Sequence, residues 1–87
     1  MARVELVRRA RQEVLDLDWP LAGAVDEALG LLEGDPEAGK ALQGRLRGLR
    51  SLRFGTYRVI YQLDERHRLV RVLAVRHRAV AYKTDPR

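Results

Sequence analysis

The chain contains no cysteine, few aromatic residues and only two lysines among its 17 basic residues. Without cysteine it can form no disulfide framework, which fits a reducing cytoplasm. No apolar run approaches the roughly 20 residues that a membrane-spanning helix needs. The N-terminal stretch MARVELVRRARQEVL mixes acids with bases and lacks an unbroken apolar core, so we expect no secretion signal. The 87 residues predict one small cytoplasmic domain, residues 1–87, without membrane contact.

Several kinds of catalytic site have no basis in this sequence. The histidines, His67 and His77, are isolated and do not form a zinc-binding pattern. A phosphate-binding loop of the form G-x-x-x-x-G-K is also missing. We therefore expect neither a metal ion nor a cofactor.

The net charge of +5 hides a strong asymmetry along the chain. Residues 1–39 carry four bases against nine acids, a net of −5, and residues 40–87 carry 13 bases against three acids, a net of +10. Such segregation creates a local positive field that attracts a polyanion. Alternatively, the acids of the first half pair with the arginines of the second half inside the fold.

Hydrophobic periodicity predicts two helices and four strands. A short strand, Arg3–Val7, precedes a helix over about Arg8–Leu17, and a second helix follows the Asp18-Trp19-Pro20 break and ends near Glu33. The period then changes to two, which predicts strands at 49–54, 57–63 and 68–75. The order β-α-α-β-β-β favours an α+β fold, with a helical hairpin packed on one face of a mainly antiparallel four-stranded sheet.

Alternation within the strands predicts which residues face the helices. The helix-facing set is apolar: Leu52, Phe54, Tyr57, Val59, Tyr61, Leu63, Val70, Val72 and Ala74. The opposite, open face then carries the arginines Arg53, Arg58 and Arg71, with His77 just beyond its edge. A β-bulge near Gly55 would shift these assignments.

Two segments carry a family resemblance. The run LRGLRSLRFGTYRVIYQL and the later LVRVLAVRHRAVAYK contain a YR-x-x-Y strand and an HR-x3-Y ending. These segments, and the loop from Gly34 to Leu42, resemble the RelE/ParE toxins of bacterial toxin–antitoxin systems over essentially the whole chain. The segment GLRSLRFGTYR and the short helices are more similar to the RelE branch than to the ParE branch. RelE toxins cleave messenger RNA on the ribosome, whereas ParE toxins inhibit DNA gyrase.

The resemblance implies a metal-independent attack of a ribose 2′-hydroxyl on the adjacent phosphate. Arg58 matches the arginine of the YR-x-x-Y strand and Arg78 that of the HR ending, and both would stabilise the phosphate charge. His77 and Tyr82 are the candidates for proton transfer. Further arginines and one lysine are expected to bind RNA: Arg47, Arg50, Arg53, Arg71, Arg76 and Lys83. Alternatively, Arg58 and Arg78 form salt bridges with helix acids such as Asp26 or Glu27.

The sequence departs from the family at one point. RelE toxins carry two basic residues on the strand before YR-x-x-Y, where this chain has Leu49 and Ser51. A catalytically weakened RNA-binding protein and a ParE-like gyrase inhibitor are therefore the alternatives to a ribosome-dependent nuclease. The resemblance also implies an acidic antitoxin as partner, besides the ribosome and mRNA, in a hetero-oligomer. An uncovered sheet edge would also permit a homodimer.

Overall fold

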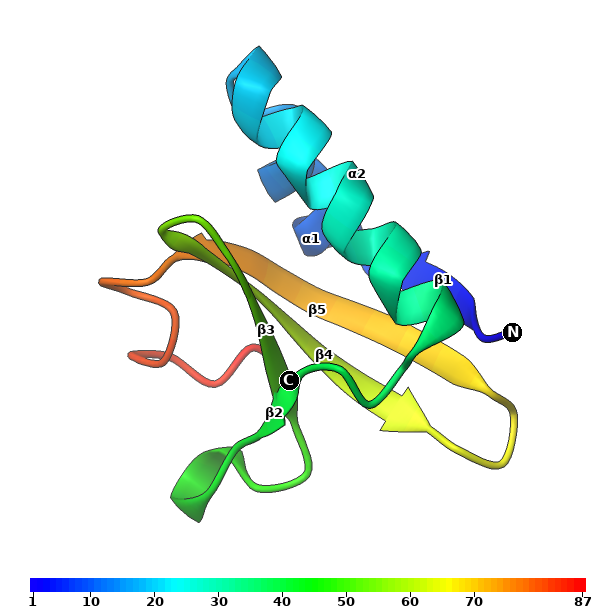
Figure 1. Ribbon diagram of the computed structural model, residues 1–87. Coiled ribbons are helices and arrows are strands. Elements are labelled where there is room, and N and C mark those ends of the chain that lie inside the picture. The colour runs from blue at the N-terminus through cyan, green and yellow to red at the C-terminus, as the bar shows by residue number, and fades with distance from the viewer.

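Five strands form one sheet in the computed structural model, which describes residues 1–87 (Figure 1). The spatial order is β1-β5-β4-β3-β2, and only β1 runs parallel to its neighbour. The strands are β1 (Arg3–Leu6), β2 (Lys40–Ala41), β3 (Arg50–Phe54), β4 (Tyr57–Asp64) and β5 (Leu69–His77). The α+β architecture is confirmed, although the sheet has five strands rather than the four expected.

Two helices, α1 (Arg8–Leu15) and α2 (Trp19–Gly34), cover one face of this sheet (Figure 1). Pro20 lies in the first turn of α2, where its missing N–H leaves no helix hydrogen bond unmade. The main apolar core packs Val25 and Leu32 of α2 against Val59, Tyr61 and other fully buried sheet residues. Neither helix has the length and apolar character needed to cross a membrane.

The additional strand, β2, consists of two residues that pair with β3. Lys40 lies opposite Ser51 and Ala41 opposite Arg50. A pair of residues is too short to show the alternation by which a strand is recognised in a sequence. Its pairing with β3 nevertheless brings Lys40 onto the sheet.

A β-bulge in the β4–β5 pair changes the predicted faces. Ile60 pairs with Ala74 and Tyr61 with Val72, so Leu73 of β5 has no partner of its own. One extra residue reverses the alternation beyond it. The predictions for Ala74 and His77 were therefore wrong. Ala74 lies with Ile60 on the face away from the helices, whereas Val75 joins the helix-side core and His77 pairs with Tyr57.

The face away from the helices carries a second, smaller apolar cluster. It consists of Leu46, Leu49, Ile60, Leu73, Ala74 and Ala81. Leu46 comes from a short 3₁₀ helix, η1 (Gly44–Leu46), and the fully buried Ala81 from the segment after β5. The C-terminal segment returns across this face towards β2 (Figure 1). The face predicted to be open is thus partly covered, and the cover determines where Tyr82 lies.

Candidate functional site

A hollow of about 350 Å³ lies on the sheet face away from the helices. Its lining consists of Lys40, Leu42, Ser51, Arg53, Arg58 and Tyr82. Half of these residues are cationic and none is acidic, so the hollow suits a small anion such as a phosphodiester. Its concave shape allows several side chains to reach one bound group.

The strand register explains how these residues come together. Lys40 of β2 lies opposite Ser51 of β3, and Arg53 of β3 lies opposite Arg58 of β4. Ser51 and Arg53 are two positions apart, so they point to the same face. Directly opposed side chains on one face have Cβ atoms about 4.5–5.5 Å apart. Residues that are 18 positions apart in the sequence, Lys40 and Arg58, therefore line one hollow.

Tyr82 reaches the hollow from the segment after β5. Its hydroxyl lies 2.9 Å from Ser51 Oγ, with which it shares a hydrogen bond. Arg45 Nη2 donates to the backbone carbonyls of Tyr82 and Lys83, at 3.2 and 3.4 Å. Together with buried Ala81, these contacts hold the segment down while leaving Tyr82 38% exposed to solvent. Ser51, where the resemblance led us to expect a basic residue, is thus hydrogen-bonded to the tyrosine.

Neither Arg58 nor Arg78 pairs with a helix acid, so that alternative is wrong. Arg58 Nη1 donates only to the adjacent carbonyl of Tyr57, at 3.1 Å. Arg78 is exposed and its guanidinium has no hydrogen-bond partner, while its backbone N–H donates to the Thr56 carbonyl at 2.7 Å. Both arginines therefore keep donors available for a bound anion.

His77 is separated from the hollow by the sheet itself. After the bulge it lies beside Tyr57, with the two rings edge-on and their centroids 5.4 Å apart. Its Nδ1 accepts a hydrogen bond from the Ala79 N–H at 3.1 Å, so that nitrogen carries no proton in this arrangement. The structure thus joins Arg58 and Tyr82 in one site and leaves His77 on the other face.

Two of the predicted RNA-binding arginines use their guanidinium groups inside the protein. Arg50 donates to the carbonyls of Gly39 and Glu37, both at 3.1 Å. Arg76 lies 3.6 Å from the Glu13 carboxylate and donates to the Thr84 carbonyl at 3.0 Å, with only 12% of its side chain exposed. Arg76 is the one sheet arginine that pairs with a helix acid, so the charge-pairing alternative holds for this residue alone.

The remaining predicted RNA-binding residues are exposed around the hollow or away from it. Arg53 lines the hollow, whereas Arg47 is exposed on the loop after η1 and Lys83 is exposed next to Tyr82 on the C-terminal segment. Arg71 lies opposite Gln62, which is four residues beyond Arg58 on β4. At 3.3 Å per residue, Arg71 is therefore about 13 Å along the sheet from Arg58. Only Arg53 of this group shares the hollow with Arg58.

Lys40 is the site residue that the sequence prediction missed. It is exposed, it forms no ion pair and its ammonium has no hydrogen-bond partner. The sequence feature that could have pointed to Lys40 is the rarity of lysine in this chain, since Lys40 and Lys83 are the only lysines. Recognising it required the β2–β3 pairing, which local periodicity does not reveal.

A buried tyrosine fixes the loop that leads to Lys40. The Tyr61 hydroxyl donates to the Pro36 carbonyl at 2.8 Å and accepts from the Gly39 N–H at 2.9 Å. Gly39 is required here because a Cβ at this position would lie 2.6 Å from the same hydroxyl. Burial raises the pKa of Tyr61 above its ordinary value, so the phenol stays neutral in the folded protein.

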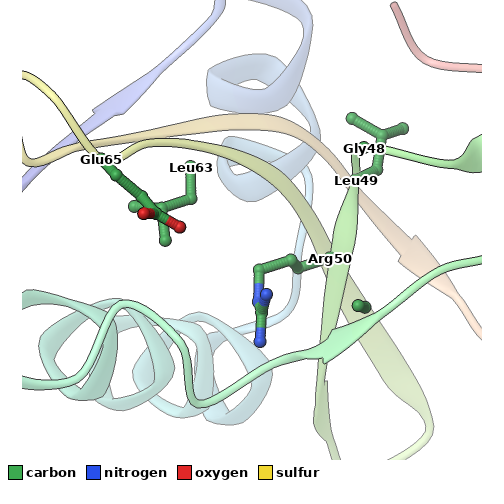
Figure 2. Close-up of a pocket in the computed structure, with 6 residues that line it drawn as sticks. Gly48, Leu49, Arg50, Leu63 and Glu65 are labelled. Atoms are coloured by element: carbon green, nitrogen blue, oxygen red, sulfur yellow. The ribbon is translucent and has the colours of Figure 1, made fainter.

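A smaller hollow, with a volume of about 160 Å³, lies at the other end of β3. Figure 2 shows the residues that line it. Arg50 and Glu65 contribute opposite charges to it, from β3 and from the turn after β4. The guanidinium of Arg50 already donates to loop carbonyls. This hollow therefore lacks the free, single-sign charge of the first one.

Comparison with known proteins shows the family of this chain. Residues 4–82 match the family model described as the ParE toxin of the parDE type II toxin–antitoxin system. The chain belongs to the RelE/ParE family of toxins. It is 36% identical over 85 residues to toxin RelE of Mycobacterium tuberculosis, covering 95% of this chain and 88% of that protein. Toxin RelG of the same organism is 44% identical over 64 residues, covering 72% of this chain and 74% of RelG.

Solved structures show the same fold for this RelE/ParE toxin. The RelBE2 toxin–antitoxin complex of M. tuberculosis matches with a TM-score of 0.80 and 37% identity, over 88% of this chain and 98% of that one. The intact E. coli RelBE complex matches with a TM-score of 0.75 at 22% identity, over 88% and 96% of the two chains. With relatives named RelE and RelG at these identities, the protein is a type II toxin of the RelE family.

Proposed function

We propose that this toxin is a ribosome-dependent messenger-RNA endonuclease that needs no metal ion. The observation that carries the proposal is the hollow beside β3, in which Lys40, Arg53 and Arg58 surround Tyr82 without any carboxylate. Phosphodiester cleavage needs positive charge at the phosphate and groups that exchange protons with the attacking and leaving oxygens. The similarity to toxins named RelE supports the choice of RNA as substrate.

The reaction follows from the chemistry of ribose. The 2′-hydroxyl oxygen bonds to the adjacent phosphorus while the bond from phosphorus to the 5′-oxygen breaks. Tyr82, as phenolate, takes the 2′ proton, and a second group returns a proton to the 5′-oxygen. Arg53 and Arg58 bind the nonbridging phosphate oxygens, whose negative charge grows in the transition state. Exposed Arg78, at the end of β5, is a further phosphate contact.

Ser51 serves this scheme without being a base. Its hydroxyl lies 2.9 Å from the Tyr82 oxygen and holds the phenol over the sheet. Leu49, the other departure from the family pattern, is buried in the second apolar cluster. The hollow still carries three cationic side chains despite these two departures, because Lys40 enters it from β2. A nuclease is therefore favoured over a weakened RNA-binding protein.

The test is induced expression followed by mapping of mRNA 5′ ends during growth arrest. We expect new ends within translated codons for the wild type, and about 10²–10³-fold fewer for Arg58→Ala, because one positioned donor is lost from the transition state. The matched control is Arg9→Ala, which removes one exposed charge from α1 on the other side of the sheet. Intact message together with blocked DNA supercoiling would favour the ParE-like alternative, to which the family-model match gives weight.

We also propose an acidic antitoxin that covers the hollow and the arginines around it. The solved relatives include toxin–antitoxin complexes. An acidic chain that neutralises the net charge of +10 on residues 40–87 would occupy the donors that otherwise bind a phosphate. We expect coexpression of such a chain to restore growth and to protect the Tyr82 segment from hydrogen exchange. Protection confined to the helices would contradict this mode of inhibition.

A further inference from the structure

The hollow contains few side chains that can pass a proton to a leaving oxygen. The guanidinium groups of Arg53 and Arg58 hold their protons more tightly than an ammonium does. His77 lies across the sheet beside Tyr57 and faces away from the hollow. Cleavage by a 2′-hydroxyl nevertheless needs two proton transfers, one at each reacting oxygen. Tyr82 can serve one of them, and the remaining candidate in the lining is Lys40.

The position of Lys40 supports this role. It lies directly opposite Ser51, whose hydroxyl is hydrogen-bonded to Tyr82. The Cβ atoms of such cross-strand partners are about 4.5–5.5 Å apart, within reach of one another's side chains. The Lys40 side chain, on β2, therefore lines the hollow beside Ser51. It forms no salt bridge and no hydrogen bond that would hold it away from a substrate.

We propose that Lys40 is the second proton-transfer residue and gives its proton to the leaving 5′-oxygen. The inference rests on the proposed nuclease function. An ammonium enters the reaction with a proton to give, as a general acid must. As the bond between phosphorus and the 5′-oxygen breaks, one N–H proton of Lys40 moves to that oxygen, leaving a neutral amine. Tyr82 has meanwhile gained the 2′ proton, and transfer of a proton from the phenol to the amine restores both groups.

The first test replaces Lys40 on purified toxin that acts on ribosomes programmed with a synthetic message. Lys40→Ala is expected to slow cleavage by about 10²-fold or more, the usual contribution of a positioned general acid. Lys40→Arg keeps the positive charge but holds its proton too tightly to give it away, so it is expected to be similarly slow. An arginine variant as fast as the wild type would show that only charge matters and would overturn the proposal.

The second test changes the leaving group. A sulfur in place of the 5′-oxygen at the cut linkage leaves as a thiolate, which does not need a proton. On this message we expect Lys40→Ala to approach the wild-type rate, while Tyr82→Phe stays slow. A Lys40→Ala defect of the same size on both messages would overturn the assignment as general acid.

Failure of this inference can be told apart from failure of the proposed function. Wild-type toxin that leaves the natural linkage uncut would overturn both. Wild-type toxin that cuts, together with a Lys40→Ala variant that cuts equally fast, would overturn only the role of Lys40. The Lys40 ammonium makes no hydrogen bond and no ion pair, so the variant is expected to unfold near the wild-type temperature, and Arg9→Ala again controls for the lost charge.

Discussion

Replacing Tyr61 by phenylalanine tests how the loop before Lys40 is held. The change keeps the fully buried ring and removes only the hydroxyl, which donates to Pro36 and accepts from Gly39. The half-buried Pro36 carbonyl can turn towards water, but the Gly39 N–H is buried and loses its acceptor. Leaving a buried donor unsatisfied costs about 1–3 kcal/mol.

We therefore expect Tyr61→Phe to lower the free energy of unfolding by about 2 kcal/mol. In a domain of this size that corresponds to a fall in Tm of about 8–16 °C. The assay is thermal and urea unfolding followed by circular dichroism. Tyr57→Phe is the matched control, because the Tyr57 hydroxyl has no hydrogen-bond partner and its loss should cost less than about 0.5 kcal/mol.

The same tyrosine predicts a dependence of stability on alkaline pH. Burial raises the pKa of Tyr61 above its ordinary value of 10.0, so the folded protein keeps a proton that the unfolded chain releases. The contribution of the Tyr61 hydroxyl to stability is therefore fully present below the ordinary pKa of tyrosine. It is lost as the pH rises through the higher pKa of the folded protein. The difference in stability between wild type and Tyr61→Phe should therefore shrink above pH 10.0. If wild type and Tyr61→Phe differ by less than about 0.5 kcal/mol in free energy of unfolding at neutral pH, the hydroxyl does not hold the loop.

Two further variants test the parts that position Tyr82. Ser51→Ala removes the partner of the phenol at 2.9 Å, and the loss of about 1 kcal/mol should slow cleavage on programmed ribosomes about fivefold; an unchanged rate would show that the phenol needs no such support. Arg76→Ala removes the ion-pair partner of Glu13, whose carboxylate still accepts from the Val75 N–H at 2.9 Å, and frees the Thr84 carbonyl. Because Glu13 is partly exposed, we expect a loss of only about 1–3 kcal/mol, less than for a fully buried pair. Hydrogen exchange of residues 79–87 should also become faster. Unchanged protection of these residues would show that Arg76 does not hold the C-terminal segment.

The helices and the main strands were predictable because their signals are local. Val25 and Leu32 recur at helical spacing, and Val59 and Tyr61 alternate along β4, so each pattern is visible within one segment. The YR-x-x-Y and HR-x3-Y segments likewise lie within single stretches, and the family that they indicated is confirmed.

The errors arose where one segment depends on another. Leu73 looks like any other residue of an alternating strand, and only its missing partner on β4 shows that it is a bulge. His77 was placed on the wrong face for that reason. Lys40 was overlooked because two residues become a strand only through their partners on β3.

The order of the elements, the arginine-rich second half and the family of this toxin follow from the sequence alone, because periodicity, composition and motifs are properties of contiguous residues. Which side chains share the hollow depends instead on how distant segments pack. That outcome depends on strand register, on one unpaired residue in β5 and on a C-terminal segment held by Arg45 and Arg76. Each of these is a contact between distant parts of the chain, which local patterns do not record.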